Sequence, residues 1–265
     1  MSAARAYYLS YQDPVARWAN NVSRNGASVS PTRVSAMRRF VEAEKRIGAD
    51  RIFDEYWFPW GENETQGLVS FKLGLVGQAV NSPTWTANQG YTGDGLSAYV
   101  RLGFIPSVHG RAMSGGRARV EVYIRTNAGG TMETIGVTGG GVGIRFRPRT
   151  GSDTTSSAVM SALTASATAV TDSRGLKGTE RNGTSALSFD GNGTALADAT
   201  AGTLLTILPT REFFLLAQNN NGTAATFDSR QVGYAAVGAP MVDAALKAAH
   251  YANVQQLATD IGANV

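Results

Sequence analysis

The chain has 265 residues, of which 43% are hydrophobic and 17% charged, with a formal net charge of +4. So mild a positive charge argues against a dedicated nucleic-acid-binding protein, whose basic residues are much denser. Because the sequence contains no cysteine, it excludes a disulfide framework, a thiolate metal site and a cysteine nucleophile.

The 31 glycines favour many short strands joined by tight turns over long, charged helices. No stretch has the roughly 18 apolar residues that a membrane span requires. Residues 1–12 lack a basic start followed by a hydrophobic run, which a secretory signal would show. We therefore expect no membrane span and no secretory signal.

Helix signals fill the first part of the chain, residues 1–67. The spans 13–26 and 30–48 each open on a side chain that accepts helix amide protons, followed by proline, and each ends in glycine. Apolar residues follow helical spacing inside both spans. A third, shorter helix is expected over 50–59.

From about residue 68 the hydrophobic period changes to two. Val120, Val122 and Ile124 alternate with polar residues, which predicts a strand buried on one face, with Arg119 and Arg125 exposed on the other. The other strand candidates are 67–71, 98–104, 131–137, 144–149, 186–190, 212–217 and 230–237.

Two spans complete the pattern. Residues 150–176 are rich in Ser, Thr and Ala and are read as a hairpin or an exposed loop. Residues 240–261 predict a closing helix, in one or two segments, that packs on the sandwich or on the first helices.

The fold class that follows is mainly β, a two-layer antiparallel β-sandwich of the jelly-roll type. We expect an N-terminal helical attachment region over 1–67, the sandwich over 68–239, and the closing helix over 240–265.

Three stretches, in this order, resemble lectin-like proteins of tailed bacteriophages. The first is Asn25–Pro31 with the aromatic run Phe53–Trp60, the second runs over 80–104, and the third is the closing helix up to Gly262. The resemblance covers most of the chain in outline. It implies a concanavalin A-like (LamG-like) jelly-roll domain in a virion protein such as a tail fibre, spike or baseplate element, and it implies no reaction.

Catalytic signals are weak. Asp54 and Glu55 would diverge by about 100° on a helix, so we expect a solvated helix face rather than a pair of acids. His109 and His250 lie in different elements, without metal-ligand spacing. The glycine run 139–143 precedes a strand, which favours a turn over a phosphate loop. We therefore predict no catalytic residues and no enzyme.

A calcium ion is the one cofactor left open, because lectin-like sandwiches often carry one. Asp94, Asp190 and Asp198 offer hard oxygen ligands, but their spacing is not diagnostic. We predict no metal-ligating residue and no cofactor.

Arginines supply the main candidate binding surface. Arg145, Arg147 and Arg149 alternate along one strand about 6.6 Å apart, and Arg125 with the strand 117–125 extends their surface if the two strands are neighbours. Their repulsion predicts an acidic partner, either a neighbouring subunit or an anionic surface polysaccharide. Direct contact with DNA and a simply solvated sheet face remain alternatives.

Aromatic residues in the second resembling stretch are the other candidates. Trp85 and Tyr91, and Tyr99 beyond them, would stack on sugar rings if exposed. Core packing is the more common role of such side chains.

We therefore expect a non-enzymatic structural component of a tailed-phage particle that is assembled in the host bacterial cytoplasm. Its partners would be other virion proteins, copies of itself in an oligomer such as a trimer, and a host-surface polysaccharide. The alternatives are a head-decoration or head-fibre protein used only in assembly, and a glycan hydrolase.

Overall fold

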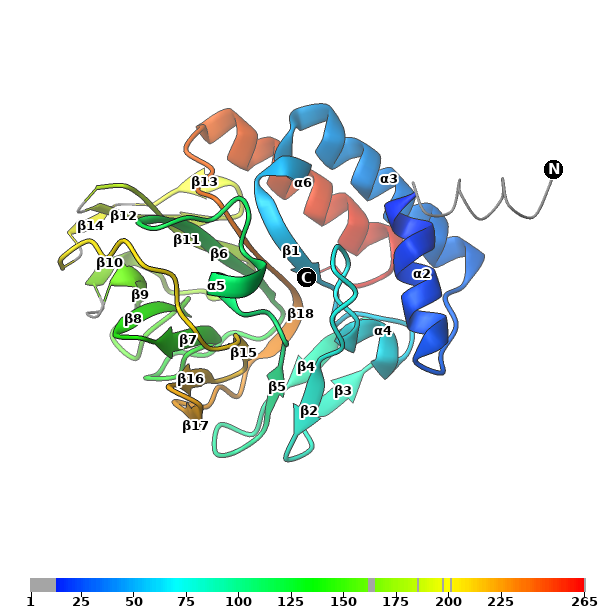
Figure 1. Cartoon of the computed structure of the whole chain (residues 1–265), viewed down its shortest axis with the longest axis horizontal. Helices are drawn as coiled ribbons and strands as arrows, with labels where there is room; N and C mark the ends of the chain where they lie inside the picture. Colours follow the sequence, from blue (N-terminus) through cyan, green and yellow to red (C-terminus); the bar gives the residue numbers. More distant parts are fainter. Residues whose placement is uncertain (1–12, 162–164, 185, 197, 201, 265) are drawn as a thin grey trace.

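The computed structural model describes residues 13–161, 165–184, 186–196, 198–200 and 202–264. The predicted absence of a secretory signal concerns residues 1–12, which lie outside the described residues. The described chain forms three layers, namely helices, an inner sheet and an outer sheet (Figure 1). The predicted two-layer antiparallel sandwich is confirmed, with the helices as a third layer on the inner sheet.

The helices lie mostly at the two ends of the chain. They are α2 (Pro14–Arg24), α3 (Pro31–Ile47), the 3-10 helix η1 (Ala49–Arg51), α4 (Glu64–Leu68), α5 (Pro106–His109) and α6 (Ala244–Asp260). No described helix is both long and apolar enough to cross a membrane.

The inner sheet follows the order β13-β12-β11-β6-β18-β4-β3, with β1 also pairing with β18 and β14 with β12. Its strands are β1 (Phe53–Trp57), β3 (Thr84–Thr86), β4 (Gly90–Thr92), β6 (Arg117–Ile124), β11 (Gly175–Asn182), β12 (Ala186–Gly191), β13 (Thr194–Ala195), β14 (Ala199–Thr200) and β18 (Gln231–Gly238).

The outer sheet follows the order β10-β9-β8-β7-β15-β5-β2, and the hairpin β16–β17 is attached through β7. The only parallel pairing among the described strands joins β16 to β7. The strands are β2 (Gln78–Val80), β5 (Tyr99–Arg101), β7 (Ile135–Gly139), β8 (Val142–Arg147), β9 (Thr154–Ser161), β10 (Ala165–Ala169), β15 (Phe214–Leu215), β16 (Gln218–Asn220) and β17 (Thr223–Ala225).

The first two predicted helices are confirmed together with their caps. Asp13 Oδ1 accepts hydrogen bonds from the amides of Val15 and Ala16, and Ser30 Oγ accepts one from Arg33 N, 3.1 Å away. The second helix ends at Gly48, whose φ of 76° is a left-handed value that glycine adopts without strain.

The predicted third helix, over 50–59, is wrong. Only Ala49–Arg51 forms a 3-10 turn, and the chain then enters β1, which pairs with β18. Trp57 packs between the two sheets, whereas Tyr56 faces the helices. Both faces of this aromatic segment are therefore buried, and sheet pairing overrides its helical spacing.

Backbone pairing decides the outcome of two other predictions, for residues 67–71 and 150–176. The strand expected over 67–71 is wrong, because this segment ends α4 and then makes a single bridge between Val69 and Val76. The span 150–176 contains the hairpin β9–β10, the first of its two expected forms. Residues 162–164 of that span lie outside the described residues.

Two apolar cores hold the layers together. The first lies between the sheets and includes Val120, Val122 and Ile124, as predicted. The second lies between the inner sheet and the helices and contains Trp18, Phe40 and many other apolar side chains. The closing helix α6 is one continuous helix whose Val254, Leu257 and Ala258 are buried in this second core, so its predicted docking is confirmed.

The predicted exposure of Arg119 is wrong. Its side chain points away from the sandwich core, as the alternation requires, but α3 and α6 cover that face of the inner sheet (Figure 1). Arg119 is only 1% exposed. The strand β6 is therefore buried on both faces, one apolar and one charged.

Candidate functional site

A buried ionic network fills the space between the inner sheet and α6. Arg119 contacts three carboxylates, with Nε 2.8 Å from Glu121 and Nη1 2.8 Å from Glu180 and 2.7 Å from Asp190. Lys247 of α6 adds a second cation 2.8 Å from Glu180. Because every described member has intrachain partners, the network ties the closing helix to the sheet.

His250 continues this network towards α3. Its Nδ1 lies 2.8 Å from Glu44 Oε2, and its Nε2 lies 2.7 Å from Glu121 Oε1. Burial by itself lowers the pKa of His250, but the charges of Glu121 and Glu44 outweigh burial and raise it to about 10. His250 is therefore a charged link between α6, β6 and α3, and its ring has no face open for catalysis.

The raised pKa of His250 predicts that the protein loses stability as the pH becomes alkaline. Because the folded value of about 10 exceeds the unfolded value of about 6.5, the stabilisation is complete below pH 6.5 and is lost as pH rises through 10. The advantage of the parent over His250→Asn should fall by about 1.4 kcal/mol per pH unit in this window. Urea titrations at pH 6, 8 and 10 measure it.

The matched control for this prediction is His109→Asn. His109 accepts a hydrogen bond from Ile105 N, and burial and then Arg111 lower its pKa, so its titration lies below the window. A His250→Asn difference that stays constant from pH 6 to 10 would contradict the charged link.

Asp54 and Glu55 are not on a solvated helix face, because they belong to β1 and are buried. Asp54 accepts hydrogen bonds from three successive amides, those of residues 111–113. Glu55 accepts them from the amides of Lys72 and Leu73 and from the Ser70 hydroxyl. Both carboxylates hold loops in place, and their lone pairs are used in doing so.

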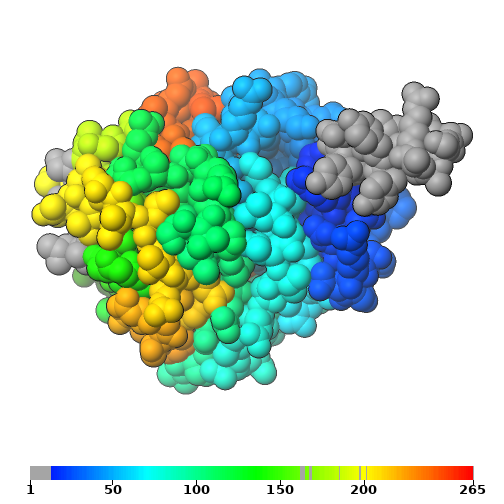
Figure 2. All heavy atoms as spheres, in the orientation of Figure 1, coloured from blue at the N-terminus to red at the C-terminus, as the bar shows by residue number. Residues whose placement is uncertain are grey.

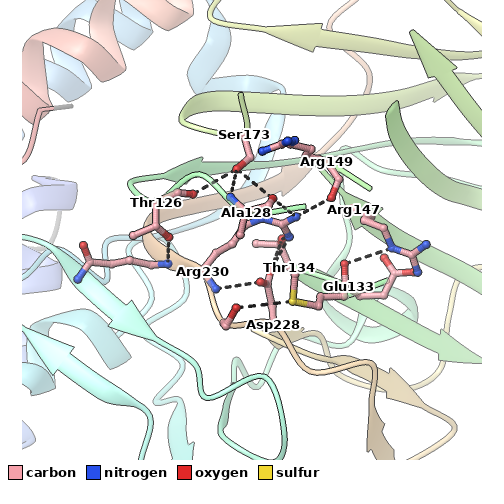
Figure 3. Close-up of polar contacts among 12 residues, drawn as sticks. Thr126, Ala128, Glu133, Thr134, Arg147, Arg149, Ser173, Asp228 and Arg230 are labelled. Carbon is pink, nitrogen blue, oxygen red and sulfur yellow. Dashed lines mark hydrogen bonds and ion pairs between the residues drawn. The ribbon is translucent and has the colours of Figure 1, made fainter. Parts of the chain in front are cut away.

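A second buried cluster joins three loops (Figure 3). Arg230 Nη1 lies 2.8 Å from Asp228 Oδ2 and donates to Thr134, while its other nitrogens donate to the carbonyl oxygens of Ala128 and Arg149. Arg230 and Asp228 are both fully buried. This cluster fixes the ends of the strands around it and offers no open group to a ligand.

The three candidate arginines of one strand do not form a free ladder. Arg145 and Arg147 point outward from β8, but Arg149 lies beyond its end. Arg147 pairs with Glu133 at 3.0 Å (Figure 3). Arg149 pairs with Asp153 at 2.6 Å. The counter-charges of Arg147 and Arg149 are therefore supplied by the chain itself.

Arg125 does not extend that surface. It follows β6 in the inner sheet, whereas β8 belongs to the outer sheet, so the two strands are not neighbours. Its Nε donates to Gln231 Oε1 at 3.2 Å. The proposed joint surface of the two arginine strands is wrong, because the sandwich places them in opposite layers.

Trp85 and Tyr91 take the core role that the sequence left as their alternative. Tyr91 is fully buried between the sheets, with its hydroxyl 3.1 Å from Glu64. Trp85 is half-buried against the same core and donates from Nε1 to the Pro59 carbonyl oxygen at 3.1 Å. Tyr91 therefore has no ring face open to a ligand, whereas Trp85 in β3 of the inner sheet is only partly covered.

The candidate calcium ligands do not meet. Asp94 accepts hydrogen bonds from three successive amides of its own turn, which hold its pKa well below the ordinary value, whereas Asp190 lies in the Arg119 network. Asp198 is exposed. Among the described residues no group of three potential ligands gathers in a way that could hold a metal ion. The glycine run 139–143 spans the predicted turn, with residues 140–141 between the end of β7 and the start of β8.

The best candidate site is a hollow of about 310 Å³ on the outer face of the outer sheet. Tyr99 and Arg101 reach it from β5, on the opposite side from Val100, which is buried in the sandwich core. The segment before β15 and the hairpin β16–β17 form its other walls. Figure 2 shows the chain of β15–β17 beside the chain of β2–β5 on one face of the molecule.

A cluster of three aromatic rings, those of Tyr99, Phe214 and Phe227, forms an aromatic floor beside this hollow. The rings of Tyr99 and Phe214 are 4.7 Å apart between centroids, and Phe227 lies 6.0 Å from Tyr99. Phe214 is 3% exposed, whereas Tyr99 is only partly covered. Tyr99 is therefore held by its neighbours while part of its ring still lines the hollow.

Charged side chains also line the hollow. Arg101 donates from Nε to Glu212 Oε1 at 2.8 Å, and Gly103 N donates to Glu212 Oε2 at 2.9 Å. Asn219 donates to the Glu212 carbonyl oxygen and accepts from Gly222 N, which fixes the hairpin wall. The hollow thus combines an aromatic surface with fixed polar groups, the combination that small-molecule sites use.

Sequence reasoning identified only part of this site. The sequence indicates Tyr99 as a candidate for sugar stacking, but nothing in it singles out Arg101, Arg211 or Glu212. Arg101 and Glu212 are far apart in the sequence and meet because β15 pairs with β5. Without knowledge of that pairing, the sequence carries no signal that joins them.

No protein-family model matches the sequence, and no curated protein matches it at a significant level. Solved structures do resemble it. Domain 4 of an extracellular GH43 arabinanase from Geobacillus stearothermophilus, solved in complex with arabinotriose, is 10% identical with a TM-score of 0.50. The match covers 75% of this chain and 98% of that domain.

Two other similar structures match less closely. The Trypanosoma rangeli sialidase in complex with 2,3-difluorosialic acid is 12% identical, with a TM-score of 0.48, over 82% of this chain and 39% of the sialidase. The Ruminococcus gnavus IT-sialidase CBM40 is 12% identical, with a TM-score of 0.39, over 51% of this chain and 83% of that chain. At such identities the arabinanase domain shows the β-sandwich fold alone.

Proposed function

We propose that this chain is a non-catalytic, glycan-binding structural component of a tailed-phage particle. The observation that carries the proposal is the hollow on the outer sheet, which is lined by the aromatic Tyr99 together with polar and charged side chains such as Arg101 and Asn219. The arabinanase domain that shares the fold was solved with arabinotriose, which supports a sugar as the ligand of such a sandwich.

The hollow favours binding over hydrolysis. Hydrolysis of a glycosidic bond requires two carboxyl groups placed on either side of that bond. Glu212 is the one carboxylate among the described residues that line the hollow, and both of its oxygens are engaged, by Arg101 and by Gly103 N. Its role is to position Arg101.

The layer order supports a placement within the particle. The helices α2, α3 and α6 cover the inner sheet, so they lie on the opposite side of the molecule from the outer sheet (Figure 1). The stretch 80–104, which carries the resemblance to phage lectin-like proteins, supplies Tyr99 and Arg101 to the hollow. In our proposal the helices contact other virion proteins, and the hollow faces a host-surface polysaccharide.

Replacing Tyr99 with leucine is expected to weaken glycan binding about twofold to twelvefold. Leucine retains apolar contact with Phe214 but removes the flat ring, whose stacking contributes about 0.5–1.5 kcal/mol. Biolayer interferometry on purified capsular and O-chain polysaccharides of proteobacteria measures the affinity, and a thermal melt establishes that the variant is folded.

The matched control is Tyr251→Leu, a half-buried tyrosine of α6 on the helical side. It should leave the affinity unchanged. Parent protein that releases reducing ends from the bound polysaccharide would contradict the non-catalytic assignment, and parent protein that binds none of the polysaccharides would contradict glycan binding.

Placement in the particle is tested separately. A cryo-electron microscopy map of the phage whose genome encodes this chain should contain its density in a tail fibre, spike or baseplate, in several copies. Density on the capsid surface alone would favour the head-decoration alternative.

A further inference from the structure

We propose that the glycan bound in the hollow carries an anionic group, which the guanidinium groups of Arg101 and Arg211 bind together. This inference rests on the proposed function and names the chemical class of the ligand. It concerns the same hollow on the outer sheet, which Arg101 and Arg211 line together with Tyr99.

Arg101 is held in place without being covered. Its Nε and Nη2 both donate to one oxygen of Glu212, and the second oxygen of that carboxylate accepts from Gly103 N at 2.9 Å. The side chain of Arg101 is still 48% exposed, against 15% for Glu212. The carboxylate therefore holds the guanidinium through Nε and Nη2, while about half of the Arg101 side chain stays exposed at the hollow.

Arg211 adds a second positive charge to the hollow, and Glu212 neutralises only that of Arg101. Its side chain is exposed, and it has no ion-pair partner within the part of the chain that the structure describes. The hollow is thus lined by two cations and a single anion. A neutral sugar would offer no counter-charge to these arginines. A carboxylate or phosphate would, and it also fits the planar, two-pronged geometry of the guanidinium group.

The backbone beside Arg211 is built for close approach. A Cβ atom on Gly139, at the end of β7, would lie 2.9 Å from Arg211 Cγ and 3.1 Å from the amides of Thr210 and Arg211. Glycine at this position lets the segment before β15 lie directly against β7. The stem of Arg211 therefore rests on the sheet, which limits the positions that its guanidinium can take.

Charge attraction would also assist the encounter. The sequence has an isoelectric point of about 9.5 and a formal net charge of +4, so an acidic polysaccharide is attracted to the molecule as a whole. Arg147 and Arg149 are already paired with Glu133 and Asp153, so they do not compete with the hollow for the anion.

The test compares chemically matched forms of each polysaccharide. Each purified capsular or O-chain glycan is used in its native form, after carboxyl reduction, which converts uronic acids into neutral sugars, and after dephosphorylation with hydrofluoric acid. We expect native glycan to bind at least tenfold more tightly than the form that has lost its anion. The treatment that lowers binding identifies the anion as carboxylate or phosphate.

Variants locate the effect. Arg211→Ser should weaken binding of the native form about tenfold, should not change binding of the neutral form, and should reduce the salt dependence of binding. The charge-matched control is Arg24→Ser, an exposed arginine at the end of α2 on the helical side, which should bind like the parent.

The two proposals fail in different ways. Equal affinity for native and neutral forms, with Tyr99→Leu weakening both, would overturn the anionic inference and leave glycan binding intact. Loss of affinity in Arg24→Ser equal to that in Arg211→Ser would reduce the effect to net charge and would also overturn the inference. Parent protein that binds no form of any glycan would overturn both proposals.

Discussion

Replacing Arg119 with methionine is expected to lower the free energy of unfolding by about 3–5 kcal/mol, because it removes one partner from a buried ion cluster. Arg119 is 1% exposed and contacts Glu121, Glu180 and Asp190. Without it, Lys247 and His250 remain as the cations that face these carboxylates. Urea denaturation at pH 7 measures the loss.

The control for this prediction is Arg174→Met. Arg174 also lies 2.8 Å from a carboxylate, that of Asp172, but both side chains are about half exposed. Water solvates the remaining carboxylate, so the expected cost is below about 0.5 kcal/mol. Equal losses for the two variants would show that the Arg119 network contributes no more than a surface pair.

The same network explains where sequence reasoning about the fold succeeded and where it failed. The alternation of Val120, Val122 and Ile124 predicted the correct inward face, because apolar burial between two sheets is a local property of the strand. The opposite face of β6 carries polar residues, and a polar face of a strand normally indicates that this face is exposed to solvent. Nothing in β6 itself signals that Lys247 and His250 of α6, more than a hundred residues later, complete its charges.

The third predicted helix failed for a related reason. Its aromatic residues at helical spacing are equally compatible with a strand that is buried on both faces. Trp57 and Tyr56 lie in different cores on either side of the inner sheet, so only the pairing of β1 with β18 distinguishes the two readings. Local spacing does not contain that long-range information.

The candidate site shows the same limit. An alternating row such as Arg145 and Arg147 is visible in the sequence, yet Arg147 is paired with Glu133. The less conspicuous Arg211 has no such partner among the described residues and lines the hollow. Charge patterns in a sequence report where arginines are, whereas the fold decides which of them the chain neutralises.

Replacing Arg230 with methionine is expected to cost about 3–5 kcal/mol, comparable to the loss at Arg119. Asp228 would lose its buried counter-charge, and the carbonyl oxygens of Ala128 and Arg149 would lose their donors (Figure 3). Replacing Arg230 with lysine should cost less than replacing it with methionine, because lysine keeps the positive charge beside Asp228. Some stability should still be lost, because the lysine ammonium cannot bond to three loops at once as the planar guanidinium does.

A double substitution tests whether Asp228 and Arg230 stabilise the protein as a pair or independently. Asp228→Leu combined with Arg230→Met removes both buried charges, so the double variant should be more stable than the sum of the two single losses predicts. Unfolding free energies of the four proteins at pH 7 give this coupling energy. Strictly additive losses would mean that Asp228 and Arg230 stabilise the loops independently, through their separate hydrogen bonds to Thr134 and Ala128, rather than as a pair.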